Sequence, residues 1–495
     1  MLARGGGCEV SIALLLGSMG LAACGRVGFD VRDADVAIDA PGLDAPGLDA
    51  PGLDAPGLDA PGLDAPGLDA PAPDSGTDAA PCTLVASSCR TGEAASLEAC
   101  ECVPAQPAGG LSTYLGRTSY TRAISVSAGR GAFVAGWAPG VATLTRHDPT
   151  TGARVAATDL ALEAVTRGYA VAAGTSYVAL GGMVELNGGF IATYPLDFAA
   201  GAAPRATIRV EPRAQLYVGT AGRGFLVFAG HVQGEAGAVR DGTGAVLQSL
   251  EASPRGAQRP IVVVLDDATG GFRVATVLEG ISGSACESRD IALGPDGVLW
   301  VTGLGTLVRP IDGAEIPGPW LARLDPVSGI LLTLSPIAVA TTGRAMSLAV
   351  VAGRVLAAFV DADATRWRVG TLGPDGVWSE LTLRGVIDGF LDSEPCLTPT
   401  TRGFAIAARV PDTSDGAGWR LSSFRDDGAQ RWTTTVRWSG TVASDFDPNL
   451  ANCLGDDGAS GWFTFLGPSS GAAARFEDGM MSTSGGANIT GYFTP

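Results

Sequence analysis

The sequence contains no lysine, because all 33 of its basic residues are arginine. This absence excludes a lysine-dependent phosphate loop, a Schiff-base lysine and a Ser/Lys dyad. Histidine is nearly absent as well, since the only two, His147 and His231, have no second His and no Cys at metal-ligand spacing. The net charge is −18, so no basic stripe is available to displace phosphate counterions, and we expect no nucleic-acid partner.

Apolar runs of about 18 residues, the length that spans a bilayer as a helix, are also missing. The N-terminus instead carries Arg4, a short apolar stretch from Val10 to Leu21, and then Leu21-Ala22-Ala23-Cys24. This order of charge, apolar core and small residues is typical of a cleavable secretory signal. The chain is therefore predicted to be exported.

The segment from Leu21 to Cys24 resembles the lipobox of bacterial lipoproteins. The resemblance implies that residues 1–23 are a signal peptide and that fatty acids such as palmitate are attached to the sulfur and the new amino group of Cys24. Several acyl chains on one residue form a stable membrane anchor. Gly25, rather than Asp, after the cysteine implies the outer membrane or the cell surface. An ordinary signal peptide with an incidental cysteine is the alternative.

Residues 24–81 have a composition of their own, and Ala-Pro-Gly-Leu-Asp occurs six times in tandem from Ala40 to Asp69. A five-residue unit with one Leu has no face to bury and cannot build a solenoid. Pro favours extended geometry, while twelve Asp and two Arg place ten of the eighteen net negative charges here. We predict a disordered acidic stalk that holds the folded part away from the membrane.

Residues 82–104 form a predicted cysteine module, because Cys82, Cys89, Cys100 and Cys102 lie close together in an exported chain. A Cys100–Cys102 bridge would close a strained ring, so each of these two is expected to pair with Cys82 or Cys89. A four-cysteine zinc site is the alternative. Because paired C-x2-C knuckles are missing, we predict disulfides and no metal.

Residues 105–495 repeat a pattern of two hairpins, seen best in SRDIALGPDGVLWVTG from Ser288 and the following PWLARLDPVSGILLTL. Predicted strands at 290–293 and 298–302 flank Gly-Pro-Asp-Gly, and strands at 320–324 and 330–334 flank Asp-Pro-Val-Ser-Gly. Gly and Pro supply the turn dihedrals, while β-branched and aromatic residues fill the strands. Each unit is therefore expected to contain four strands.

The second strand of this unit recurs at intervals of 44, 48, 74, 56, 49 and 58 residues, with one insertion in the third unit, starting at Phe133, Tyr177, Phe225, Leu299, Val355, Phe404 and Trp462. Repeated four-stranded units indicate a β-propeller. The units resemble the SBBP repeats of exported bacterial proteins and, more loosely, quinoprotein-like repeats. We predict an all-β fold, a seven-bladed β-propeller of four-stranded blades. Two stacked β-sandwiches are the alternative.

Three later cysteines fall within this repeat. Cys396 and Cys453 come near the start of the innermost strands of consecutive units, so a disulfide between them is our hypothesis, with Cys286 a buried thiol. Three buried thiols are the alternative, because Cα atoms more than about 7 Å apart cannot be bridged.

No segment of the sequence matches a complete catalytic or cofactor-binding motif. Residues 467–471 match G-x-S-x-G, but no His follows them. Asp445, Asp447 and Asn449 resemble the opening of a calcium loop, but Leu450 replaces its turn glycine. Neither a quinoprotein cofactor site nor a sialidase-type Asp box is matched, so we expect no cofactor. Blade packing is the predicted role of five tryptophans: Trp300, Trp320, Trp367, Trp419 and Trp432.

Together these features predict a non-enzymatic lipoprotein whose propeller binds an unknown protein or glycan at the outer membrane or cell surface, with the membrane itself contacted through Cys24. A propeller enzyme acting on extracellular polymer and a periplasm-facing scaffold for outer-membrane assembly are the alternatives, because fold alone does not dictate function.

Overall fold

The computed structural model describes residues 93–96, 101–104, 111–113, 120–138, 140–148, 154–185, 187–255, 258–281, 284–337, 346–360, 367–383, 396–400, 403–413, 416–439, 454–456, 461–466, 473–476, 479–481 and 488–493. Contacts divide the chain into two units, Met1–Asp78 and Ala79–Pro495, and all described residues belong to the second. Among them, no helix has the length and apolar character needed to cross a membrane. The predicted signal peptide and most of the predicted stalk and cysteine module lie outside the described residues.

Within the described residues, six antiparallel sheets each contain four strands in chain order from the inside outward. Blades 1 and 2 are formed by β4 (Tyr120–Ser127), β5 (Gly131–Ala138), β6 (Val141–His147) and β7 (Arg154–Leu160), and by β8 (Thr166–Ala173), β9 (Tyr177–Val184), β10 (Gly188–Pro195) and β11 (Ala206–Glu211). Blades 3 and 4 are formed by β12 (Gln215–Gly222), β13 (Phe225–Val232), β16 (Arg259–Asp266) and β17 (Phe272–Val277), and by β18 (Glu287–Leu293), β19 (Leu299–Leu304), β22 (Trp320–Leu324) and β23 (Leu331–Pro336). Blades 5 and 6 are formed by β24 (Met346–Val351), β25 (Arg354–Val360), β26 (Trp367–Leu372) and β27 (Trp378–Glu380), and by β28 (Cys396–Thr400), β29 (Gly403–Thr413), β30 (Gly416–Phe424) and β31 (Gln430–Ser439).

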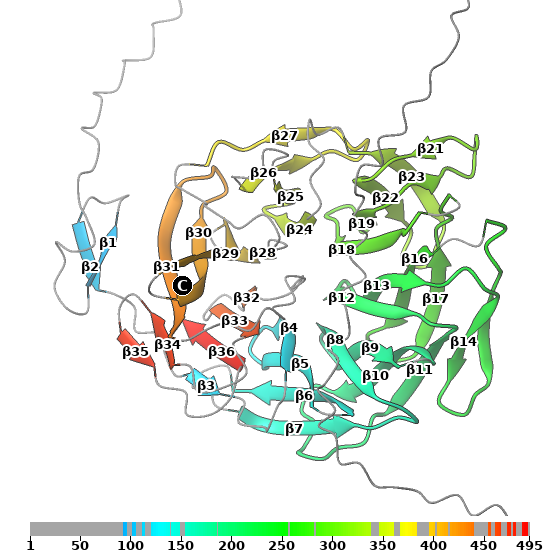
Figure 1. Cartoon of the computed structure of the whole chain (residues 1–495), viewed down its shortest axis with the longest axis horizontal. Helices are drawn as coiled ribbons and strands as arrows, with labels where there is room; N and C mark the ends of the chain where they lie inside the picture. Colours follow the sequence, from blue (N-terminus) through cyan, green and yellow to red (C-terminus); the bar gives the residue numbers. More distant parts are fainter. Residues whose placement is uncertain are drawn as a thin grey trace, which may run out of the picture. The chain divides into compact units, whose positions relative to one another are not determined.

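The innermost strands contact one another in sequence, β4 to β8, β12, β18, β24 and β28 (Figure 1). Blades 2 to 5 therefore each meet a blade on either side around a centre, which confirms a β-propeller and excludes two stacked sandwiches. The turns of the repeat are those expected from its sequence. Gly297 in Gly-Pro-Asp-Gly has a φ of 80° and Gly329 in Asp-Pro-Val-Ser-Gly has a φ of 72°, in the left-handed region that favours glycine.

The predicted insertion in the third unit is a hairpin that joins a neighbouring blade. Its strands β14 (Gly237–Asp241) and β15 (Val246–Leu250) lie between β13 and β16 in the chain, but β14 pairs with β11 and extends the sheet of blade 2. A smaller hairpin, β20 (Leu307–Val308) and β21 (Glu315–Ile316), lies between β19 and β22. The long interval before Leu299 thus reflects an added edge rather than a missing unit.

The predicted count of seven four-stranded blades is corrected to six. The strands expected to form the seventh unit are divided between two sheets: β34 (Ala473–Phe476) and β35 (Gly479–Met481) extend blade 6 beyond β31. The others, β32 (Leu454–Asp456), β33 (Gly461–Leu466) and β36 (Asn488–Phe493), share a composite sheet with β3 (Leu111–Thr113) from the start of the domain. An unpaired sheet edge can form hydrogen bonds with any strand that lies close enough. The expected seventh unit therefore does not follow the repeat.

The predicted cysteine module contains one described hairpin, β1 (Glu93–Ser96) and β2 (Glu101–Pro104), in which Cys102 pairs with Ala95 through the backbone.

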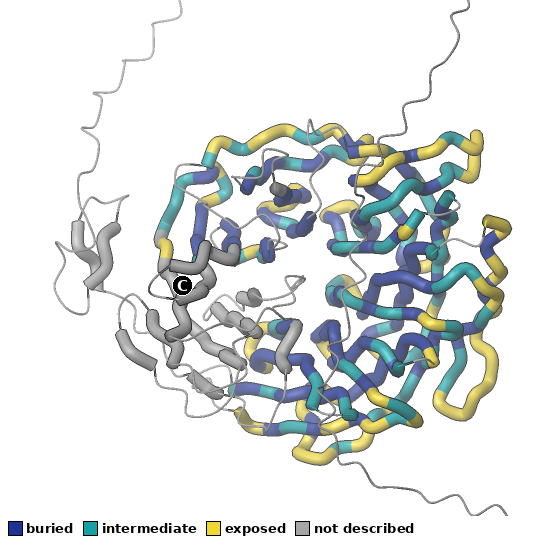
Figure 2. The backbone as a smooth tube through the Cα atoms, viewed as in Figure 1, coloured by how far each residue is buried: buried dark blue, intermediate teal, exposed yellow. Residues whose placement is uncertain are grey.

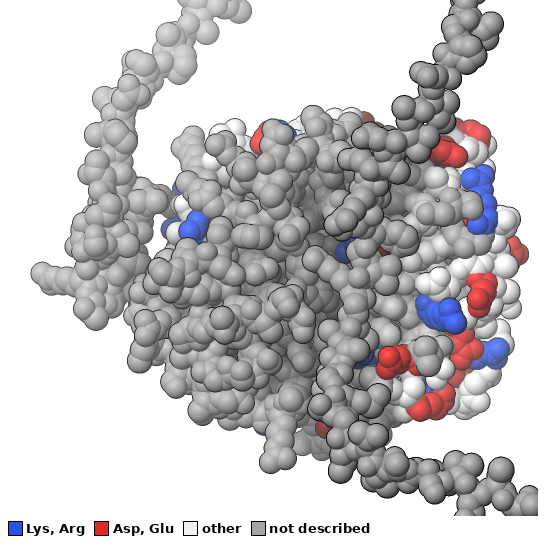
Figure 3. Space-filling view, viewed as in Figure 1, with Lys and Arg blue, Asp and Glu red and all other residues white. Residues whose placement is uncertain are grey.

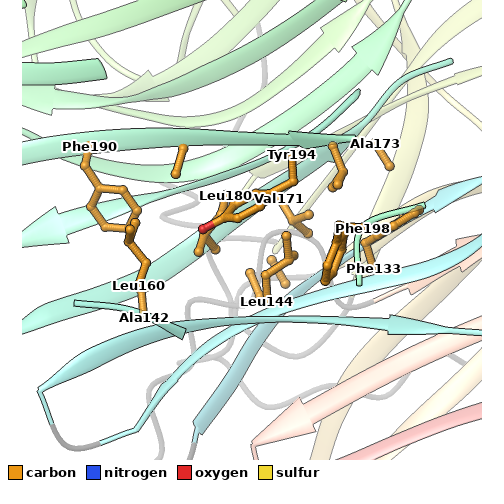
Figure 4. Close-up of a cluster of buried hydrophobic side chains, with 14 of the residues drawn as sticks. Phe133, Ala142, Leu144, Leu160, Val171, Ala173, Leu180, Phe190, Tyr194 and Phe198 are labelled. Carbon is orange, nitrogen blue, oxygen red and sulfur yellow. The ribbon is translucent and has the colours of Figure 1, made fainter. Parts of the chain in front are cut away.

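Hydrophobic clusters join each consecutive pair among blades 1 to 6. Between blades 1 and 2, Phe133 packs on Phe198, which in turn contacts Tyr194, with ring centroids 6.4 and 5.7 Å apart (Figure 4). Buried residues concentrate on the inner strands and exposed residues on the outer turns (Figure 2). As predicted for blade packing, Trp300, Trp320 and Trp367 are buried in these clusters. Each of blades 2 to 5 is covered by a neighbour on either side, so both faces of its sheet are removed from water.

Candidate functional site

A bulge near the start of the inner strand recurs in blades 1 to 4. The register shifts between Thr121 and Ala123 in blade 1, and between Gly168 and Ala170, Leu216 and Val218, and Ser288 and Asp290 in blades 2, 3 and 4. In blades 2, 3 and 4 the residues skipped by the pairing are Tyr169, Tyr217 and Arg289. A bulge re-aims the side chain of the extra residue, which gives three adjacent blades a side chain in an equivalent place.

Aromatic rings follow one another across blades 1, 2 and 3 at this end of the inner strands. Trp137 of β5 meets Tyr169 edge-on with centroids 5.4 Å apart and an interplanar angle of 89°. Tyr169 lies 6.1 Å from Tyr217, and Tyr217 lies 5.4 Å from His231 of β13. These separations are those of favourable aromatic pairs. Tyr169 and His231 are buried, whereas Trp137 and Tyr217 are only partly buried.

The row ends in polar groups. The Tyr217 hydroxyl donates to Gln215 Oε1 at 2.9 Å and lies 2.9 Å from His231 Nδ1. A hydroxyl carries one proton, so donation to Gln215 leaves its oxygen to accept a hydrogen bond from Nδ1–H of His231. In the neighbouring blade 4, Glu287 and Arg289 of β18 form an ion pair with each other. We call Trp137, Tyr169, Tyr217, His231, Glu287 and Arg289 the aromatic cluster.

His231 is neutral at physiological pH. Burial, and secondly the positive charge of Arg289, lower its pKa from 6.5 to about 4. Glu287 Oε2 lies 3.7 Å from His231 Nδ1, a distance at which a protonated imidazole would form an ion pair. Because the pKa of His231 is low, its imidazole is neutral where it contacts Glu287. The charge of the Glu287 carboxylate is balanced by Arg289. The three groups therefore carry no net charge.

A cavity of about 300 Å³ lies further along the inner strands, toward their C-terminal ends. All six blades contribute to its lining, and Arg223 is the one charged residue among the described residues that line it. Arg223 Nη2 donates to the Pro295 carbonyl at 2.5 Å, across the boundary between blades 3 and 4. The cavity wall otherwise consists of small, apolar and hydroxyl-bearing residues, including Ser125, Thr220 and Thr398.

Two buried carboxylates join blades rather than form a reactive centre. Asp267, in blade 3, accepts hydrogen bonds from the turn between β8 and β9, with Thr175 N at 2.7 Å, Thr175 Oγ1 at 2.6 Å and Tyr177 N at 3.1 Å. Asp290, in blade 4, accepts from Ser347 Oγ at 2.8 Å and Leu348 N at 2.6 Å in blade 5. Buried carboxylates bonded in this way hold neighbouring elements in register.

The sequence-predicted sites fall mostly elsewhere. Cys286 is a buried thiol, as predicted, and burial raises its pKa. Cys396 is buried as well. Between described residues there is no disulfide, and the predicted pairing of Cys396 with Cys453 stays a prediction. Outside the described residues lie Cys24, Cys82, Cys89, Cys100, Cys453, the Asp445–Asn449 segment and residues 467–471.

No group of three or more potential metal ligands occurs in the part of the chain that the structure describes. On the visible side of that part, acidic and basic side chains are interspersed rather than segregated (Figure 3).

Sequence reasoning missed the aromatic cluster, although a weak signal was present. Tyr169 and Tyr217 each stand eight residues before the first residue of the second strand, Tyr177 and Phe225 respectively. Aligning the inner strands on their second strands would have shown two tyrosines in equivalent places. The bulges that orient them depend on the pairing of strands and leave no mark in hydrophobic periodicity.

The chain matches no family model and no curated protein sequence. Similar solved structures include the β-propeller domain of Cps50 (Swd1) from Myceliophteria thermophila, 11% identical with a TM-score of 0.39, where the match covers 78% of this chain and 99% of that one. BamB from Moraxella catarrhalis is 11% identical with a TM-score of 0.37, covering 78% and 100%. The periplasmic gluconolactonase PpgL from Pseudomonas aeruginosa is 15% identical with a TM-score of 0.31, covering 53% and 84%. These likenesses concern the fold alone.

Proposed function

We propose that this protein is a lipid-anchored envelope protein whose propeller binds a protein or glycan without transforming it. The observation that carries the proposal is the aromatic cluster, where two partly exposed rings, Trp137 and Tyr217, adjoin fixed polar groups. Binding sites combine aromatic surface with a few oriented hydrogen-bonding groups in this manner. Because the rings are held by their neighbours, little conformational entropy is lost when a ligand binds.

Binding is favoured over catalysis by the state of the titratable groups. An imidazole with a pKa of about 4 is a weak general base near neutral pH. The Glu287 carboxylate is already engaged in an ion pair with Arg289. These features support a binding role over the alternative of a polymer-acting enzyme.

Placement at the envelope rests on the sequence. The lipobox-like segment ending at Cys24 supports a lipid anchor, and the acidic stalk of residues 24–81 supports a spacer between membrane and propeller. We expect Cys24→Ser to abolish incorporation of a labelled fatty acid and to release the protein from the membrane fraction. Undiminished label in the variant would contradict the anchor. Cleavage of the anchored protein by protease added to intact cells distinguishes the cell surface from a periplasm-facing scaffold.

The binding role is tested with the full chain carrying Cys24→Ser, which keeps the propeller and the stalk in a protein without the anchor. The protein is immobilised and exposed to envelope extract of the source organism. We expect material to be retained by the otherwise unchanged protein and to be lost when Tyr217→Ala is added. Retention that is unaffected by Tyr217→Ala, or none from either protein, would contradict ligand binding at the aromatic cluster.

A further inference from the structure

Resting on the proposed binding function, we propose that the ligand of the aromatic cluster is a neutral saccharide. The cluster offers aromatic surface, paired polar groups and a balanced charge in one place. A saccharide ring has an apolar face of C–H groups and a rim of hydroxyls, and it needs these three features together.

Stacking surface comes from two blades. Trp137 and Tyr217 are partly exposed and flank the buried Tyr169, which contacts both rings. Tyr169 is itself held, because its hydroxyl donates to Met183 Sδ at 3.1 Å. The two outer rings are thus positioned before a ligand arrives, and an apolar sugar face gains both burial and contact with the ring electrons.

Polar groups beside Tyr217 match the hydroxyls of a sugar. Glu287 offers acceptor oxygens, Arg289 offers donors in a planar fork, and Gln215 offers a carboxamide. A sugar hydroxyl both donates and accepts, so a paired carboxylate and guanidinium can bond adjacent hydroxyls. The Tyr217 hydroxyl, bonded to Gln215, keeps the amide oriented.

The charge of the cluster favours a neutral ligand over a charged one. Glu287 and Arg289 cancel, and His231 is neutral because its pKa is about 4. A cation at the tyrosine faces would gain no net electrostatic attraction from this neutralised pair. A polyanion would be repelled by the part of the chain outside the stalk, which carries the remaining eight of the eighteen net negative charges.

A protein partner fits the cluster less well than a saccharide. Protein interfaces use contiguous apolar patches. Among the described residues, the large apolar side chains with the greatest exposure lie on outer strands and turns, including Val246 of β15, Ile311 and Ile330. None of these belongs to the aromatic cluster.

The test is a calorimetric titration at pH 7 of the full chain carrying Cys24→Ser. Three kinds of probe are used: neutral gluco-, manno- and galacto-hexaoses, acidic oligogalacturonate and cationic chitosan hexamer. We expect a neutral hexaose to bind more tightly than either charged probe. Tyr217→Ala and Trp137→Ala should each weaken that binding about tenfold or more, the scale of an aromatic anchor.

The matched control is Tyr177→Ala. Tyr177 is a partly exposed tyrosine at the opposite end of blade 2, beneath Arg205, and its loss should leave saccharide affinity unchanged. Thermal melting of each variant identifies loss of folding. Tyr217→Phe keeps the ring and removes the bonds to Gln215 and His231, so it should retain more affinity than Tyr217→Ala if stacking contributes.

Preferential binding of an acidic or cationic probe would overturn the proposal, as would equal affinity in folded Tyr217→Ala. Treating the envelope extract separately with periodate and with protease distinguishes this proposal from the binding role. If no probe binds, and Tyr217-dependent retention survives periodate but not protease, the ligand is a protein. In that case the proposal of a saccharide ligand is wrong and the proposed binding role is kept. If no material is retained even from the untreated extract, both the saccharide proposal and the binding role are contradicted.

Discussion

Acidification should destabilise the propeller through the buried imidazole of His231. Its pKa is lowered from 6.5 to about 4, first by burial and then by Arg289. Above pH 6.5 the imidazole is neutral in both folded and unfolded chains and contributes no pH dependence. Between pH 6.5 and 4 the unfolded chain binds the proton and the folded chain does not, so the free energy of unfolding falls as the pH falls. Below pH 4 both are protonated and this contribution levels off.

The expected loss follows from the size of the pKa difference. Each unit corresponds to about 1.4 kcal/mol, so the full loss at His231 is roughly 3 kcal/mol. In the folded protein, protonation would place a positive charge against the Arg289 guanidinium in a buried site. The lowered pKa values of Asp241 and Asp296 start from 3.8, so these groups titrate mainly below the window in which His231 acts.

The measurement is a series of denaturant titrations between pH 7.5 and 4 on the parent and on His231→Gln. Glutamine is polar and does not titrate, so the difference in free energy of unfolding between the two proteins should change by roughly 3 kcal/mol across the window. The control is His147→Gln, which removes the only other histidine and should keep the slope due to His231. If His231→Gln loses stability with acid as steeply as the parent, the reasoning is refuted.

Three further predictions concern the contacts that join blades and the buried thiol. Asp267→Ala removes the acceptor for Thr175 and Tyr177 backbone donors, and should lower the free energy of unfolding by about 2–4 kcal/mol in denaturant titration; an unchanged midpoint would contradict the role. Asp290→Ala should cost about 2–3 kcal/mol, whereas Asp290→Asn, which keeps an acceptor, should cost less, and equal losses would show that the acceptor is unimportant. Burial raises the pKa of Cys286, so iodoacetamide should modify it in the native protein at least tenfold more slowly than in urea, as read by mass spectrometry; comparable rates would mean that the thiol is accessible.

The repeated unit was readable from the sequence because its information is local. Gly297 and Gly329 mark tight turns, and alternation of apolar residues marks the strands between them, so β18, β19, β22 and β23 fall within three residues of their predicted positions. The insertion before Leu299 and the buried tryptophans followed from the same pattern. Local turn chemistry and side-chain periodicity depend on neighbours along the chain, so they can be predicted from the sequence without a structure.

The blade count and the aromatic cluster required the tertiary structure. Strands β34 and β35 extend blade 6, while β3 pairs with β36 from the far end of the domain, and these choices depend on which edges come within reach. Trp137 and Arg289 stand 152 residues apart in the chain but belong to one cluster of contacts. They are brought together because the blades are arranged around one centre, and the bulge in β18 re-aims Arg289. Strand pairing between distant parts of the chain determines both the blade count and the aromatic cluster, and no local sequence pattern encodes that pairing.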